Sequence, residues 1–205
     1  MSGTGNVIEA QGLNKEKLKE NLFLGVEPRR EVDYFVKPFL DLQVYAYFKG
    51  EGCIGKIRST SDDKLMKEIW SIAYENTRQS IIATKLYTAV KEAYEMGCID
   101  DPEIPDIIYG PNKDMDVYVV TNFETVRGAA AILITEAMEI LWEKIGNFYI
   151  IPSSVHELIV STDVPPEDLR YMVREVNDSE HVDEDELLSY NIYRYDHTKK
   201  EVVMC

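Results

Sequence analysis

The sequence predicts a single α+β domain with a mainly antiparallel sheet and helices packed on one face. Three observations support this fold class. Apolar residues make up 45% of the 205 residues, which is enough for a hydrophobic core. Short segments with strand character and segments with helical spacing are mixed along the chain. They do not follow a regular β-α-β alternation, and this favours an antiparallel sheet over a parallel one.

The first 34 residues are expected to form a helical or loosely ordered segment ahead of the α+β domain at 35–205. Residues 13–24 have leucines at helical spacing, and Pro28 ends the pattern. The basic residues here are interleaved with acidic ones, so we interpret the segment as a solvated helix and loop. The acidic residues concerned are Glu16, Glu20, Glu27 and Glu31.

Residues 39–48 are expected to form the first strand of the sheet, because apolar side chains alternate there. Turn residues at 49–52 then predict a hairpin with 53–58 as its second strand. Gly50, Gly55 and Lys56 also satisfy the pattern of a phosphate-binding loop. Such a loop needs Ser or Thr next and then a helix, whereas Ile57 follows Lys56. We therefore interpret these glycines as a hairpin turn.

Two helices are expected next. Ser and Asp residues at 59–63 favour a helix start, and the helix should end near Asn76. A second helix should close at Gly97, ahead of a proline-containing loop at 100–116. The residues expected to face the core are Leu65, Ile69, Ile72 and Ala73 in the first helix, and Leu86, Ala89, Val90 and Ala93 in the second.

The remainder of the chain should complete the sheet. Strands are expected at 117–121, 129–133, 148–151 and 158–160, with a helix at 135–145 and a terminal hairpin at 191–195 and 201–204. Prolines at 165 and 166 favour a further helix start. The buried stripe of that helix should be Leu169, Met172, Val173 and Val176.

Charge and cysteine content restrict the class of protein. The net charge is −15, from 37 acidic and 22 basic residues, which repels nucleic-acid phosphates and anionic membranes. We expect neither as a partner. Three widely spaced cysteines do not predict a disulfide framework or a zinc ribbon, so the cytoplasm is the expected location. We identify no secretory signal and no apolar run near the roughly 20 residues of a membrane span.

The segment from Ser153 to Glu157 contains the side chains best suited to chemistry. Serine, histidine and glutamate are the residue types of nucleophilic hydrolysis, which makes Ser154, His156 and Glu157 weak catalytic candidates. Neighbours on one extended segment cannot form a Ser–His pair easily, and the nucleophile-elbow sequence is absent. Val160 replaces the second histidine of a zinc helix. The alternative interpretation is that the serines satisfy backbone groups and that His156 holds the loop.

No metal site or cofactor is expected. The acidic tract at 178–186 lacks the glycine that a calcium loop requires, and acids at a helix start need no ligand. The 13 tyrosines are suited to a half-buried protein interface, although ordinary sheet packing also explains them.

Several segments together resemble the bacterial family known as domain of unknown function 5688. They cover about residues 35–204 in the same order. The resemblance implies kinship and a common fold, and it implies no particular activity. The segments are Phe39-Leu-Asp-Leu-Gln-Val-Tyr45, Ala73-Tyr-Glu-Asn-Thr77, Val117-Tyr-Val-Val-Thr-Asn122, Gly128-Ala-Ala-Ala-Ile-Leu133, Ile151-Pro-Ser-Ser-Val-His-Glu157, Met172-Val-Arg-Glu-Val-Asn177 and Tyr193-Arg-Tyr-Asp196.

The leading hypothesis is a cytosolic, non-catalytic domain that interacts with a protein or binds a ligand. Its binding residues should be Asn122, Ser153, Ser154, His156 and Asn177. The alternative is a hydrolase-like enzyme that uses 153–157, with Asn122 or Asn177 nearby. A protein is the expected partner, and the sequence does not predict an oligomeric state.

Overall fold

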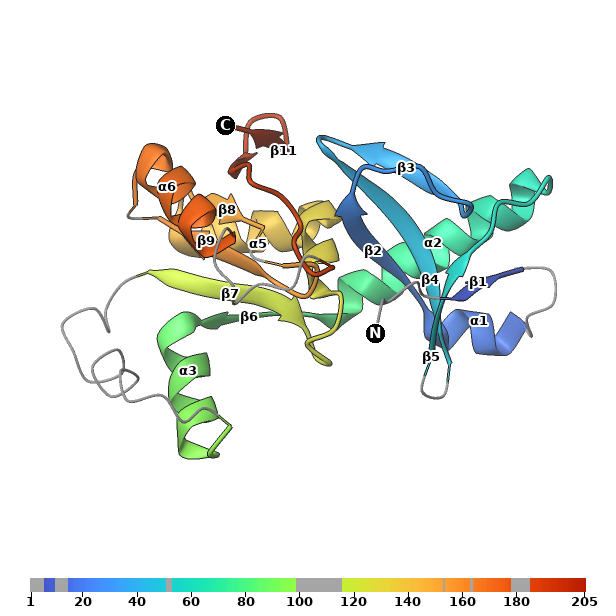
Figure 1. Ribbon diagram of the computed structural model, residues 1–205, viewed down its shortest axis with the longest axis horizontal. Coiled ribbons are helices and arrows are strands. Elements are labelled where there is room, and N and C mark those ends of the chain that lie inside the picture. The colour runs from blue at the N-terminus through green and yellow to red at the C-terminus, as the bar shows by residue number, and fades with distance from the viewer. Residues whose placement is uncertain are drawn as a thin grey trace.

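Two β-sheets, connected by the long helix α2 (Asp63–Ser80), make up the protein (Figure 1). The computed structural model describes residues 6–9, 15–50, 53–98, 116–152, 154–162, 164–177 and 185–205. The α+β class with mostly antiparallel pairing is confirmed. The prediction of one sheet is wrong, because the strands divide into a five-stranded and a six-stranded sheet.

The first sheet has the order β1-β5-β4-β2, and β3 also pairs with β4. Among the described strands of this sheet, β1 and β5 form the one parallel pair. The predicted hairpin is confirmed as β4 and β5. The predicted strand at 39–48 is interrupted at Leu40, whose φ is 51°, so its start belongs to β3. The strands are β1 (Asn6–Ile8), β2 (Leu22–Pro28), β3 (Val36–Phe39), β4 (Leu42–Gly50) and β5 (Cys53–Ile57).

The predicted helix at 13–24 is wrong after Asn21. Helix α1 (Lys15–Asn21) ends there and β2 begins at once. Leu22, Leu24 and Val26 are buried, and this alternation places them on the core face of a strand. The interpretation of Glu27 as solvated is also wrong, because its side chain lies on the other face and is buried.

Helix α2 begins at the predicted cap. The Asp62 carboxylate accepts hydrogen bonds from the backbone N–H groups of Lys64 and Leu65, both at 3.0 Å. The helix continues four residues past Asn76 to Ser80. The sequence did not predict the strand that follows, β6 (Ile81–Lys85), which leads directly into the predicted second helix, α3 (Leu86–Glu95). Gly97 adopts a φ of 72°, as expected after a helix end.

The second sheet has the order β11-β10-β8-β9-β7-β6, and all its pairs are antiparallel. The strands predicted at 117–121, 148–151 and 158–160 and the terminal hairpin are confirmed. The strand predicted at 129–133 is wrong, because Gly128–Leu133 forms a buried 3-10 helix, η3. The observed strands are β7 (Val117–Asn122), β8 (Tyr149–Ile151), β9 (Leu158–Ser161), β10 (Tyr193–Asp196) and β11 (Glu201–Met204).

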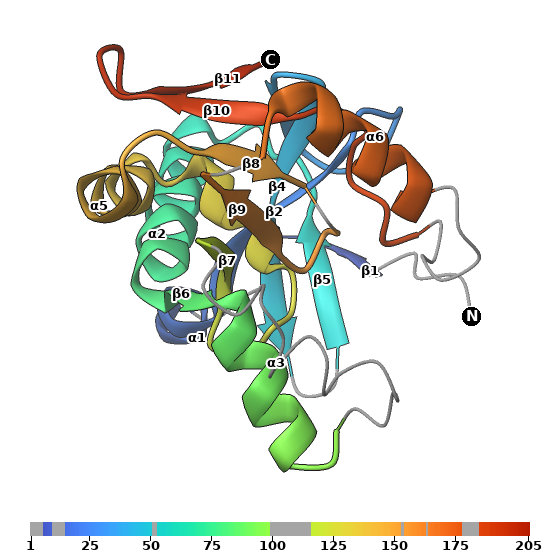
Figure 2. The same ribbon diagram turned by 90° about the vertical axis from the view of Figure 1, so that its left-hand side faces the viewer.

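One hydrophobic core extends through both sheets and includes residues of α2, η3 and the predicted helix α5 (Thr135–Ile145). Figure 2 shows α5 and α6 (Pro166–Asn177) on opposite sides of β8 and β9. In α6 the predicted stripe is confirmed at Leu169 and Val173, which pack with Ile192 in a second, smaller core. Met172 was expected to be buried but is 50% exposed.

Most of the predicted loop at 100–116 and of the acidic tract at 178–186 lies outside the described residues, as does Ser153. Among the helices that the structure describes, none has the length and apolar character to span a bilayer.

Candidate functional site

The loop between β8 and β9 contains Ser154 and His156, and it forms hydrogen bonds both within itself and to neighbouring segments. The hydroxyl of Ser154 accepts from the backbone N–H of His156 at 3.0 Å. The His156 ring accepts at Nδ1 from the backbone N–H of Arg127 at 3.2 Å, and its Nε2 lies 3.4 Å from a carboxylate oxygen of Glu186. The backbone N–H of Ser154 donates to the carbonyl of Glu157 at 3.4 Å. Both ring nitrogens therefore have partners other than the Ser154 hydroxyl.

This geometry does not provide the Ser–His hydrogen bond that activates a serine nucleophile. The serine shapes the backbone of its own loop, which is a common role for serine after a strand. His156 connects the loop to Arg127 on one side and to Glu186 on the other. These observed contacts correspond to the loop-holding interpretation of the sequence.

Asn122 lies close to this loop, at the end of β7. Its side chain accepts from the backbone N–H groups of Glu124 at 3.1 Å and Val126 at 3.3 Å, and it donates to the carbonyl of Val126 at 2.7 Å. The neighbouring Thr121 hydroxyl donates to the carbonyl of His156 at 2.8 Å. The structure thus brings Asn122 and His156 together through Thr121.

Asn177 belongs to a different network. Its amide donates to the carbonyl of Ser189 at 3.3 Å. Ser189 in turn donates to Asp41, in the turn before β4, at 2.6 Å. Asp41 also accepts from Asn191 at 2.9 Å and from the hydroxyl of Tyr193 at 2.7 Å. Burial opposes ionisation of Asp41, but the hydrogen bonds from these three side chains hold its pKa below the usual value.

A buried ion pair lies on the face of the first sheet opposite the hydrophobic core. The ammonium of Lys56 is 2.7 Å from a carboxylate oxygen of Glu27 and 2.7 Å from the hydroxyl of Tyr34. Glu27 also accepts from Gln43 at 2.9 Å and from Arg30 at 3.0 Å. Burial raises the pKa of Glu27, but hydrogen bonds from Lys56, Tyr34 and Gln43 outweigh it and leave the pKa lowered. Burial lowers the pKa of Lys56 despite Glu27.

Sequence reasoning did not identify this ion pair. Lys56 was noticed only as part of an incomplete phosphate-loop pattern. The sequence does contain a pattern that could have indicated it. Neighbouring residues of a strand face opposite sides of the sheet, so Lys56 must point away from the core that Ile57 faces. Because every polar atom of the pair has a partner, we interpret the Glu27–Lys56 pair as structural.

Arg127 connects the His156 loop to the first sheet. Its backbone has a φ of 57°, a left-handed conformation that is uncommon outside glycine. The backbone N–H donates to His156, and the guanidinium donates to the hydroxyl of Tyr45. The Tyr45 ring lies across Gly25, where an added Cβ would be 2.4 Å from ring atom Cζ. Glycine at this position lets the ring approach the strand closely.

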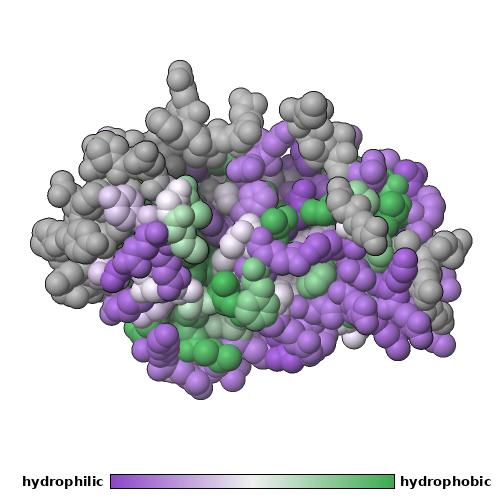
Figure 3. Space-filling model, turned by 90° about the horizontal axis from the view of Figure 1, so that it is seen from below, coloured by the Kyte–Doolittle hydropathy of each residue, from purple (hydrophilic) through white to green (hydrophobic). Residues whose placement is uncertain are grey.

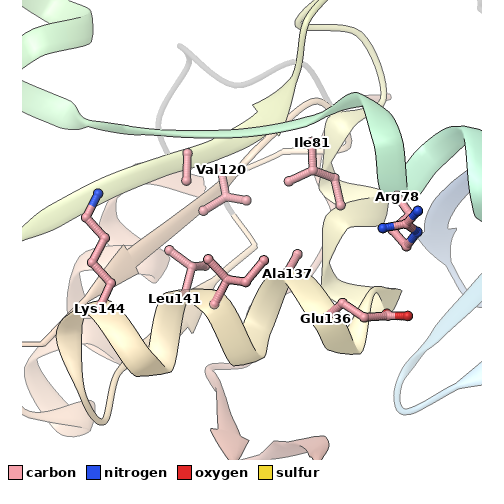
Figure 4. A pocket seen from close by; sticks show the side chains of 9 residues that line it. Arg78, Ile81, Val120, Glu136, Ala137, Leu141 and Lys144 are labelled. Carbon is pink, nitrogen blue, oxygen red and sulfur yellow. The ribbon is translucent and has the colours of Figure 1, made fainter.

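A separate apolar groove lies between α5 and the strands β6 and β7. Its volume is about 270 Å³. Figure 4 shows Ile81 and Val120 pointing from the strands toward Ala137 and Leu141 of α5. Ile140 of α5 also lines the groove and is 64% exposed. This is a large exposed aliphatic side chain beside a concave surface, a combination that marks binding sites.

Charged side chains lie at the two ends of the groove (Figure 4). Lys144 is at one end, 5.5 Å from the ring centroid of Tyr118, and it forms no salt bridge with any described residue. Arg78 and Glu136 are at the other end, where Arg78 pairs with Glu75 at 2.6 Å. Seen from below, hydrophobic residues form a patch surrounded by hydrophilic ones (Figure 3). Of the two cationic side chains that line the groove, Arg78 has a carboxylate partner among the described residues and Lys144 has none.

In the part of the chain that the structure describes, no three His, Cys, Asp or Glu side chains are grouped so as to hold a metal ion. The three cysteines are free and exposed.

The fold and these sites define an α+β protein of two mainly antiparallel sheets, with an apolar groove beside an edge strand. Residues 61–197 match the Family of unknown function (DUF5688). The match covers more than half of the chain, and the protein belongs to this family. No curated protein and no solved structure matches the chain.

Proposed function

We propose that this protein is a non-catalytic binding domain that takes an extended segment of a protein partner along strand β6. The observation that carries the proposal is the position of β6 at the edge of the second sheet, next to the apolar groove. Within the described chain β6 pairs only with β7. An edge strand offers backbone N–H and C=O groups to an added strand, and peptide recognition often uses this mode.

The groove supports an extended peptide as the occupant. Alternate side chains of a strand point to the same face, so every second residue of an added strand would face the wall formed by Ile140 and Leu141 of α5. The ammonium of Lys144 favours an acidic residue at that end of the peptide. We therefore infer a segment with alternating apolar residues and one Asp or Glu.

A second copy of the chain is a poorer occupant of the same edge. Each chain has a net charge of −15, and two such charges repel one another. A foreign segment does not carry this penalty. The three exposed thiols also support a reducing bacterial cytoplasm as the location of the domain.

The test is selection of a random peptide library on the full chain, followed by affinity measurements on the enriched peptides. We expect enrichment of alternating apolar residues with one acid. Ile140→Glu should weaken binding about tenfold or more, since it places a charge on the groove wall. Met172→Glu is the matched control, because Met172 is also an exposed apolar residue on a helix. Hydrogen exchange of the β6 amides should slow when the peptide is bound.

Two outcomes would contradict the proposal. One is that no peptide is enriched over a selection on the Ile140→Glu variant. The other is that enriched peptides bind both variants equally and leave exchange at β6 unchanged. Lys144→Glu gives the sign of the charge preference: acidic peptides should bind this variant more weakly.

A further inference from the structure

A second cavity lies where the first sheet meets the turn after β7. Its volume is about 150 Å³, smaller than the roughly 300 Å³ at which drug-sized ligand pockets begin. It therefore suits one chemical group rather than a large molecule. None of its lining residues belongs to the groove beside β6. The cavity is lined by Phe23, Tyr47, Ser80, Asn122, Phe123 and Glu124.

Three aromatic rings line this cavity. Phe23 and Tyr47 are neighbours on β2 and β4, and their ring centroids are 5.9 Å apart at an interplanar angle of 29°. Phe123 comes from the turn and is 70% exposed. A phenylalanine this exposed gains little stabilisation from burial, so its ring remains accessible to a ligand.

The turn that carries Phe123 is held by specific hydrogen bonds. The backbone N–H of Phe123 donates to the carbonyl of Ser80 at 3.1 Å. The Asn122 side chain binds the backbone of the two residues described above, Glu124 and Val126. The backbone that carries the Phe123 ring is therefore held in one position. Asn122 contributes to this site because its side chain fixes that backbone.

The cavity lining contains one carboxylate, and two cationic side chains lie close to it. Glu124 is the one lining residue with a formal charge. Lys49 of β4 forms a salt bridge with Glu124 but does not line the cavity. The guanidinium of Arg127 donates to the hydroxyl of Tyr45 and does not line the cavity, although its positive charge opposes the rise that burial causes in the pKa of Tyr47. Aromatic faces carry negative electrostatic potential and attract cations, so the rings and the carboxylate favour the same sign of ligand.

We propose that this cavity binds a small organic cation that carries a trimethylammonium group. The aromatic faces of Phe23, Tyr47 and Phe123 would contact the methyl groups, and Glu124 would balance the charge. Free quaternary ammonium metabolites and trimethylated lysine side chains share this chemistry. The site is independent of the peptide groove and does not rest on the function proposed for it.

The first test compares choline with its uncharged carbon isostere, 3,3-dimethylbutan-1-ol, by NMR titration of the full chain. Choline should bind about tenfold more tightly, because cation–π attraction acts on the charge and not on the shape. Equal binding of the two would overturn the proposal in favour of a merely apolar cavity. An Nε-trimethyllysine amide and its unmethylated lysine counterpart distinguish the two sources. If the Nε-trimethyllysine amide binds more tightly than choline, the natural ligand is a trimethylated lysine of another protein; if choline binds more tightly, it is a free metabolite.

Substitution of the charged residues changes affinity in opposite directions for a cationic and an anionic ligand. Phe123→Ala removes an exposed ring and should reduce choline affinity at least fivefold without affecting the fold. Glu124→Gln should weaken binding, whereas Lys49→Gln should strengthen it by releasing the carboxylate. Ile140→Glu in the other groove should have no effect on choline. The reverse order for Glu124→Gln and Lys49→Gln, or an unaltered affinity in Phe123→Ala, would overturn the proposal.

Discussion

The ammonium of Lys56 and the carboxylate of Glu27 lie 2.7 Å apart, and each residue is only 3% exposed. They come from β5 and β2, which are separated by β4 in the sheet. Gln43 on β4 and Tyr34 in the segment before β3 complete the hydrogen bonds of the carboxylate. The pair thus joins three strands and a loop on the face of the sheet opposite the hydrophobic core.

Lys56→Met is expected to destabilise the protein by about 3 kcal/mol. Removing one partner of a buried ion pair leaves the other charge without compensation, and this costs roughly 3–5 kcal/mol. We expect a loss near the lower end of this range, because Arg30, Tyr34 and Gln43 still donate hydrogen bonds to the Glu27 carboxylate. Urea unfolding at neutral pH measures the change. The double variant Lys56→Met with Glu27→Leu should lose less stability than the sum of the two single variants, and strict additivity would contradict the coupling.

The stability of the protein should fall in acid, partly through Asp41. Its pKa is lower in the folded state than in the unfolded chain, so its contribution is fully present above the unfolded value, about 4. The contribution is lost as the pH falls through the folded pKa. In Asp41→Asn this part of the pH dependence should disappear between about pH 5 and pH 3. Urea midpoints across that window check it, and parallel curves for both proteins would contradict it.

Gly128→Ala should destabilise the protein by about 3 kcal/mol or more. A Cβ there would be 2.2 Å from the Thr121 hydroxyl and 2.6 Å from the carbonyl oxygen of His156. Because backbone atoms of Asn122 and His156 surround this position, a side-chain rotation cannot make room for the added methyl group. Gly97→Ala is the control, since Gly97 has a φ of 72° but open space around it, and left-handed backbone strain alone costs about 1–2 kcal/mol. Equal thermal unfolding midpoints for the two variants would contradict this assignment.

The sequence predicted the elements whose pattern is local. The alternation of Leu42, Val44 and Ala46 predicted β4, and the proline pair predicted the start of α6. The strand β6 was missed because Ile81-Ile-Ala-Thr-Lys85 has no apolar alternation and is flanked directly by helices. Residues 129–133 were assigned to a strand, although their run of alanines is compatible with a helical turn. The tight packing of Gly128 against Thr121 depends on the tertiary fold.

The candidate sites show the same dependence on sequence separation. Ser154 and His156 are two residues apart, and the hydrogen bond from the His156 backbone N–H to the Ser154 hydroxyl is a local contact that the sequence favours. Lys56 and Glu27 are 29 residues apart, and Arg127 and Tyr45 are 82 apart. Such contacts follow from strand order and register, which a single sequence does not specify. Asn177 was predicted to lie near His156 because the sequence does not specify strand order and register. Its side chain donates to the carbonyl of Ser189 instead.

The hydrogen bonds of His156 allow a direct test of the hydrolase alternative. A serine nucleophile needs a ring nitrogen that accepts its proton, but Nδ1 of His156 accepts from Arg127 and Nε2 faces Glu186. We expect purified protein to hydrolyse p-nitrophenyl acetate at the same rate as Ser154→Ala and His156→Asn. The rate of His197→Asn gives the contribution of an unrelated histidine. A rate that both loop substitutions reduce equally, by a hundredfold or more, would restore the enzyme hypothesis, because two residues of one dyad lose activity together.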